Sequence, residues 1–154
     1  MPADRELQPW IDPPCWEMSP PDLTRFISEL LSFAPAGSVL CLEGANATDV
    51  EGYLEARPSA IKNETDEGFL KMREKVFFMP ITSRNLRGLA DLTEVHAEPE
   101  VCSNLRVYDG KRIILSWHDL PSDPIYVTKA IDEAALNKFC QALGCEYMFR
   151  QSAG

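Results

Sequence analysis

The stretch Ser38-Val39-Leu40-Cys41-Leu42-Glu43 decides the fold. It is a short apolar run between turn residues, and such runs are typical of strands that are buried on both faces. The loop Gly44-Ala45-Asn46-Ala47 follows, and Thr48-Asp49-Val50-Glu51 then has the capping-box pattern that begins a helix. Strand, tight loop and helix are half of a βαβ unit, which predicts a parallel strand to come.

A second unit of the same kind lies further along the chain. Val76-Phe77-Phe78-Met79-Pro80-Ile81 is another apolar run, and Pro80 marks the end or the edge of that strand because proline has no N–H to donate. Thr82 or Ser83 then caps a helix whose buried stripe would consist of Leu86, Leu89 and Ala90. Right-handed crossover geometry predicts that the two strands run parallel, with their helices on the faces of the sheet.

The chain before these units begins with a proline- and tryptophan-rich lead-in, residues 1–18. Its prolines exclude a helix, and we expect an extended strap that packs on the domain. Ser19 offers an N-cap, with Pro20 at the first helical position. The apolar face of the amphipathic helix that follows is predicted to consist of Leu23, Phe26, Ile27, Leu30 and Leu31.

The later part of the chain has an antiparallel pattern. The segments 104–107 and 111–118 flank Tyr108-Asp109-Gly110, which is a hairpin signal. A three-residue loop with a left-handed Gly110 pairs Val107 with Lys111, whereas a two-residue Asp109-Gly110 turn divides the apolar residues between both faces. We prefer the longer loop, because it collects on one face Leu105, Val107, Ile113, Leu115 and Trp117.

The end of the chain supplies one more helix and one more strand. Asp132 is predicted to cap a helix that Gly144 ends, and residues 145–149 are predicted to form a closing edge strand. The sequence therefore predicts one α/β domain over residues 1–154. Its mixed sheet would be parallel and βαβ-like in the N-terminal part and antiparallel in the C-terminal hairpin, with helices packed on it.

Composition excludes several classes of protein. There are 24 Asp and Glu against 15 Lys and Arg, a net charge of −9, which repels nucleic acid and anionic bilayers. No apolar run is long enough to span a bilayer, and the N-terminus lacks the pattern of a secretory signal. The five cysteines are an odd number without a C-x-x-C pair, so we expect reduced thiols in a cytoplasmic protein.

The two strand-to-helix junctions carry the first candidate site. If both strands are parallel, residues 44–48 and 81–85 lie at the same edge of the sheet, where two helix N-termini present amides to an anion. The residues predicted to bind that anion are Asn46, Thr48, Ser83, Arg84 and Arg87. Neither junction has a G-x-G-x-x-G pattern or a P-loop lysine, so no nucleotide cofactor is predicted.

His118 and Asp119, at the end of the hairpin, are the catalytic candidates. A histidine near neutrality serves as a general acid or base. The alternative is that His118 ends the strand and Asp119 starts a turn ahead of Leu120-Pro121. His96 lies among several carboxylates, but the spacing matches no ligand pattern and we predict no metal.

Two hypotheses of function follow. The first is a non-catalytic binding module that holds a small anion or a partner chain, with an uncovered 145–149 edge favouring pairing between two copies. The alternative is a small hydrolase or transferase in which His118 is the acid or base and Arg84, with helix amides, holds the anion. The alternative requires that His118 and Arg84 line one pocket.

Overall fold

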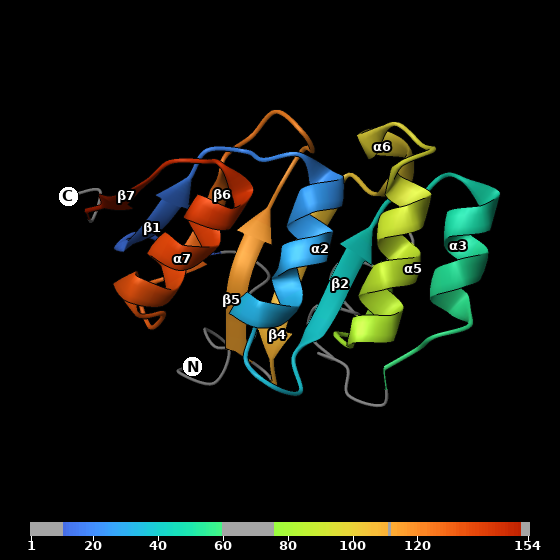
Figure 1. The fold of residues 1–154 in the computed structure, drawn as a ribbon, viewed down its shortest axis with the longest axis horizontal. Helices are drawn as coiled ribbons and strands as arrows, with labels where there is room; N and C mark the ends of the chain where they lie inside the picture. Colours follow the sequence, from blue (N-terminus) through green and yellow to red (C-terminus); the bar gives the residue numbers. More distant parts are fainter. Residues whose placement is uncertain (1–10, 60–75, 111, 152–154) are drawn as a thin grey trace.

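The computed structural model describes residues 11–59, 76–110 and 112–151 of the chain. Its strands form one seven-stranded sheet in the order β3-β2-β4-β5-β6-β1-β7 (Figure 1). The strands are β1 (Cys15–Met18), β2 (Val39–Glu43), β3 (Val76–Pro80), β4 (Asn104–Asp109), β5 (Arg112–Trp117), β6 (Ile125–Thr128) and β7 (Tyr147–Arg150). The helices are α2 (Leu23–Phe33), α3 (Thr48–Glu55), α5 (Ser83–Thr93), α6 (Glu98–Val101) and α7 (Glu133–Leu143).

The prediction of a mixed sheet with a parallel βαβ unit is wrong, because every strand pair of the described sheet is antiparallel. Val39 pairs with Pro80 and Glu43 pairs with Val76, so β3 begins at the end of the sheet where β2 stops. The crossover rule applies where a helix leads directly into the next strand, but residues 56–75 lie between the end of α3 and the beginning of β3. β2 is buried on both faces as predicted, and this burial is shared by central strands of either direction.

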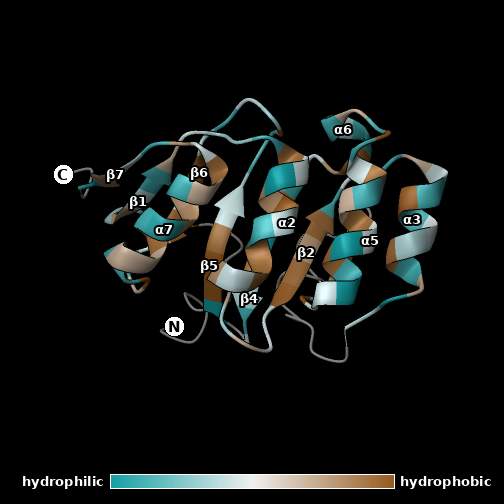
Figure 2. Cartoon of the chain, in the orientation of Figure 1, coloured by the Kyte–Doolittle hydropathy of each residue, from teal (hydrophilic) through white to brown (hydrophobic). Residues whose placement is uncertain are grey.

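Helices α2, α3, α5 and α7 lie side by side over one face of the sheet (Figure 1). Figure 2 shows hydrophobic residues along β2 and β5 beneath them. The main core joins this sheet face to the apolar stripes of the helices, and Phe26 of α2 contacts both Trp117 and Phe139 through its ring. A second, smaller cluster lies on the other face of the sheet and consists of Val39, Cys41, Phe78 and Tyr108.

The helix ends follow the predicted signals in part. Thr82 caps α5 through its hydroxyl and Gly144 ends α7 in the left-handed conformation, and both predictions are confirmed. The predicted cap of α2 is wrong, since the helix begins after Asp22, whose carboxylate accepts the Arg25 N–H. Ser19 instead accepts a hydrogen bond from the N–H of Glu146. The capping box predicted at Thr48-Asp49-Val50-Glu51 is wrong, since the N-cap of α3 is Ala47, no side chain caps the helix, and Thr48 is its first helical residue.

The hairpin keeps its predicted face except for Ile113, but not its predicted pairs. Leu105 and Val107 lie in the main core, where they face Trp117 and Leu115. The predicted pairing of Val107 with Lys111 is wrong, because β4 continues past Val107 to Asp109, which pairs with Arg112. A bulge between Val107 and Tyr108 then shifts the register by one more residue, so Val107 pairs with Leu115. The bulge also turns Ile113 to the second face of the sheet, against Tyr108. Gly110 is left-handed, as predicted.

Part of the predicted strap is a true strand. β1 lies between β6 and β7, and the Trp16 ring packs against Tyr147 and Phe149 of β7. Trp10 lies outside the described residues. The longest of the described helices have 11 residues, and none combines the length and apolar character needed to cross a bilayer.

Candidate functional site

His118 follows the end of β5 and lies over the sheet face opposite the described helices α2, α3, α5 and α7. Its Nε2 is 2.8 Å from the hydroxyl oxygen of Ser116, two residues earlier on the same face of the strand. Burial and the nearby Arg106 guanidinium hold the pKa of His118 below its usual value. The lowered pKa favours the neutral imidazole at pH 7, and its tautomer decides whether Nε2 accepts the Ser116 hydroxyl proton or donates to the hydroxyl oxygen.

A buried polar cluster on β2 and β4 lies next to this pair. The Arg106 guanidinium is 3.4 Å from the Glu43 carboxylate, and both side chains are buried. The Asn104 amide donates to the same carboxylate at 2.7 Å. The Asn104 carbonyl oxygen accepts the N–H of Asp119. Because a buried carboxylate is costly unless it is paired, these bonds hold the ends of β2, β4 and β5 together.

The chemistry of the cluster is that of a structural network. A hydroxyl and a neutral imidazole at this distance are two parts of a nucleophilic catalyst. Ser116, however, is only 1% exposed, so its oxygen lies below the surface that a substrate reaches. Asp119 is exposed, and its positive φ of 48° turns the chain after His118. The catalytic role of His118 and Asp119 therefore stays a prediction.

The predicted anion-binding residues lie at opposite ends of the sheet. Asn46 and Thr48 follow β2 at the end where Asn104 begins β4. Ser83, Arg84 and Arg87 follow β3 at the opposite end, where Val39 begins β2. The antiparallel direction of β3 causes this separation, and the shared anion cradle is absent from the described residues. Arg84 and His118 also lie on opposite faces of the sheet, since α5 packs on the helix-covered face.

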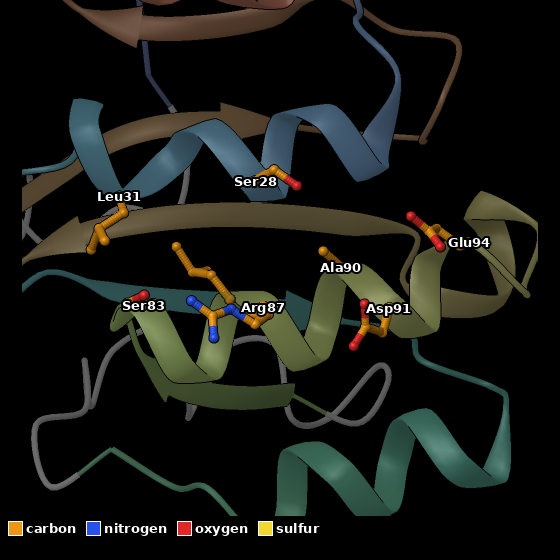
Figure 3. A pocket seen from close by; sticks show the side chains of 8 residues that line it. Ser28, Leu31, Ser83, Arg87, Ala90, Asp91 and Glu94 are labelled. Carbon is orange, nitrogen blue, oxygen red and sulfur yellow. The ribbon is translucent and has the colours of Figure 1, made fainter.

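Ser83 and Arg87 line an open groove of about 290 Å³ between α2 and α5 (Figure 3). Arg87 is the cation among the lining residues, and Asp91 and Glu94 lie on the same side of α5. Two carboxylates against one guanidinium disfavour an anion here. Leu31, which is 45% exposed, borders the groove from α2.

His96 lies between the carboxylate of Asp49 on α3 and the carboxylate of Glu100 on α6. Its Nε2 is 2.8 Å from the Asp49 carboxylate, and its Nδ1 is 3.7 Å from Glu100. The hydrogen bond with Asp49 raises the pKa of His96 and lowers the pKa of Asp49. Across residues 11–59, 76–110 and 112–151, no group of three or more His, Cys, Asp and Glu side chains is arranged to hold a metal ion.

Strand β7 forms an edge of the sheet, and within the described chain its strand neighbour is β1 alone. The Ser19 N–H donates to the Glu146 carbonyl at 2.9 Å, so the backbone of Glu146 points toward β1. Because this direction alternates along an antiparallel strand, the N–H and C=O groups of Tyr147 and Phe149 point away from the sheet. Two side chains of this strand are exposed, Met148 to 59% and Phe149 to 37%, and Tyr147 is partly buried.

A shallow hollow of about 210 Å³ adjoins this edge and is lined by Glu17, Ser19, Glu146, Tyr147 and Met148. Strand edges with unpaired backbone groups are the places where sheets accept a further strand. Residues 145–149 were predicted as an edge strand, but the outward direction of particular backbone groups depends on pairing with β1, which the sequence pattern does not show.

Comparison with protein families, with curated proteins and with solved structures finds no match for this chain.

Proposed function

We propose that this protein is a non-catalytic protein-interaction module that pairs β7 with β7 of a second copy. The observation that carries the proposal is the outward-facing backbone of Tyr147 and Phe149, flanked by exposed apolar side chains. Strand addition at such an edge gains main-chain hydrogen bonds and covers apolar surface. The sheet would then continue from one copy into the next.

The sequence of β7 is complementary to itself in the antiparallel direction. In a continuous sheet, residues that face each other across a two-fold axis point to the same side. An axis at Met148 places Met148 opposite Met148 of the second copy, and Glu146 opposite Arg150. It also places Tyr147 opposite Phe149, which are the residues whose backbone groups face outward and exchange both N–H···O bonds.

Charge pairs and ring contacts favour the register with its axis at Met148 over the register with its axis at Phe149. Opposite charges facing each other across strands contribute roughly 0.2–1 kcal/mol per pair. Arg150 already binds Glu17, yet its side chain is 51% exposed and accessible to Glu146 of the second copy. The facing Tyr147 and Phe149 rings would extend the aromatic group around Trp16, where centroids lie 5.8 and 5.0 Å apart. An axis at Phe149 would instead place Met148 opposite Arg150.

The catalytic alternative has less support. It needs His118 and Arg84 in one pocket, and they lie on opposite faces and at opposite ends of the sheet. The Ser116–His118 hydrogen bond accounts for the position of the imidazole without a substrate. A binding role requires only the surface that β7 presents.

Sedimentation velocity tests the proposal over about a hundredfold range of protein concentration. We expect the unmodified chain to shift from monomer to dimer as the concentration rises. Met148→Lys and Met148→Glu should each be monomeric, because each places like charges opposite each other at the axis. An equimolar mixture of the two variants should form dimers again, since Lys then faces Glu.

Two controls define the outcome. Met148→Leu should keep the dimer, and Leu31→Lys, which places the same charge on an exposed apolar residue of α2, should keep it too. Circular dichroism establishes that each variant is folded. A chain that stays monomeric throughout, or a Met148→Lys variant that dimerises like the unmodified chain, would refute the proposal. A dimer that survives in Met148→Glu but not in Met148→Lys would move the axis to Phe149.

A further inference from the structure

Two cysteines meet where α7 ends. The N–H of Cys145 donates to the carbonyl of Cys140 at 3.0 Å, and the N–H of Gly144 donates to Gln141 at 3.3 Å. With Gly144 at φ 71°, these bonds form a Schellman motif, which brings together the residue after the glycine and the residue in the last helical turn. Both of those residues are cysteines here, and their thiols share a side-chain hydrogen bond.

The two thiols have different surroundings. Cys140 is buried in the main core, whereas Cys145 is partly exposed beside Ser19. Hydrogen bonds from the Cys140 thiol and the Ser19 hydroxyl lower the pKa of Cys145, while the same pairing and burial raise the pKa of Cys140. Cys145 is thus the better nucleophile, because the thiolate is the reactive form of cysteine.

We propose that Cys140 and Cys145 are a modification site for peroxides, at which hydrogen peroxide converts the dithiol to a disulfide. This inference goes beyond the proposed function and is independent of it. In the first step the Cys145 thiolate attacks one peroxide oxygen, an S–O bond forms, the O–O bond breaks, and the departing hydroxide takes up a proton to become water. Cys145 is then a sulfenic acid.

In the second step the Cys140 sulfur attacks the Cys145 sulfur. The S–S bond forms, the S–O bond breaks, and the hydroxyl group leaves with the Cys140 proton as water. The two thiols are oxidised and the peroxide is reduced. An S–S bond is about 2.05 Å long. The hydrogen bond between the two thiols already places the sulfur atoms next to each other, on one side of the same turn.

Mass spectrometry of the full chain tests the proposal after treatment with hydrogen peroxide and alkylation of the remaining thiols. Trypsin releases both cysteines in one peptide, residues 139–150, between Lys138 and Arg150. We expect this peptide to lack alkyl groups and to be lighter by two hydrogens, and a dithiol reductant should reverse the change. Buried Cys15, Cys41 and Cys102 should remain alkylatable after denaturation and serve as internal controls.

Single variants identify the two roles. Cys140→Ala leaves no thiol to resolve the sulfenic acid, so its trapping at Cys145 by dimedone should increase by about tenfold over the unmodified chain. Cys145→Ser should leave Cys140 unoxidised. Three results would overturn the proposal: both thiols remain alkylatable, Cys145 proceeds to sulfinic acid as fast as in Cys140→Ala, or a covalent dimer appears on a non-reducing gel.

Discussion

His96 and His118, the two histidines of the chain, show how surroundings set opposite proton affinities. The Asp49 carboxylate stabilises the charged form of His96, whose pKa is raised. Burial and Arg106 oppose the charged form of His118, whose pKa is lowered. The contribution of His96 to stability is therefore present below the unfolded pKa and is lost as the pH rises through its folded pKa. His118 acts in the opposite sense, since stability is lost as the pH falls below its unfolded pKa.

Imidazole NMR resonances test this assignment directly. We expect the titration midpoint of His96 above 6.5, the usual value, and that of His118 below it. Asp49→Asn should return the midpoint of His96 toward 6.5 and leave His118 unchanged, because Asp49 lies on α3 and contacts His96 alone of the two. The assignment fails if the midpoints coincide, or if Asp49→Asn shifts His118 instead.

Single residues also show which helix ends a local sequence pattern can predict. Thr82 and Gly144 act as predicted because a cap needs only its own helix end. Ser19 has the right type for a cap, but its hydroxyl bonds to Glu146, 127 residues away. A local pattern contains no information about that partner, so the beginning of α2 was predicted three residues too early.

At the scale of elements, two helices contain a glycine in their middle, and the two sites differ sharply. A methyl group at Gly52 in α3 would meet nothing within 4 Å. A methyl group at Gly88 in α5 would clash with the ring and the hydroxyl of Tyr53. That hydroxyl donates a hydrogen bond to the Asn85 carbonyl at 2.8 Å. Gly88 thus allows α3 and α5 to approach closely.

Alanine at these sites should have opposite effects on the free energy of unfolding in urea. Gly52→Ala should raise it by about 0.5–1 kcal/mol, because alanine loses less backbone freedom in a helix. Gly88→Ala should lower it by about 1–3 kcal/mol, since the clash outweighs the same gain. Adding Tyr53→Ala to Gly88→Ala should cost less than Tyr53→Ala costs alone. A stabilised Gly88→Ala would contradict the close packing of the helices.

The elements were largely predictable because their apolar periodicity is local. The buried stripe of α5 is the predicted one, with Leu86, Leu89 and Ala90 facing the core. The bulge after Val107 was not predictable, because the apolar alternation on each side of the turn assumes one unbroken register and contains no signal for an extra residue. It becomes favourable only when Tyr108 and Ile113 pack with the second cluster on the far side of the sheet.

At the scale of the whole molecule, the sequence did not determine strand direction or strand order. A run such as β2 is apolar whichever way its neighbour runs, and residues 60–75 provide enough chain for β3 to start at either end of the sheet. β1 lies between β6 and β7, so Cys15 pairs with Thr128 on one side and with Arg150 on the other. The apolar periodicity of a strand does not indicate which strands more than a hundred residues away it pairs with. The candidate edge was therefore predictable as a strand, but not as a neighbour of β1.

Association through β7 also predicts a property of the whole chain, its melting temperature. A dimer that dissociates on unfolding is stabilised by mass action, so its melting temperature rises with protein concentration. We expect this rise in differential scanning calorimetry of the unmodified chain and its absence in Met148→Lys. Equal, concentration-independent melting temperatures in both proteins would contradict association in the native state.

The position of β1 has a consequence for how a break in the backbone would affect the β7 edge. β7 is attached to the sheet through β1, and β1 continues into α2 through a few exposed residues that include Ser19 and Pro20. A proteolytic cut there would leave Met148 and its neighbours chemically intact while releasing the strand that supports them. If β7 pairs with a second copy as proposed, damage far from β7 in sequence would thus abolish that pairing, and an assay of fragments would have to keep both ends of the chain to detect it.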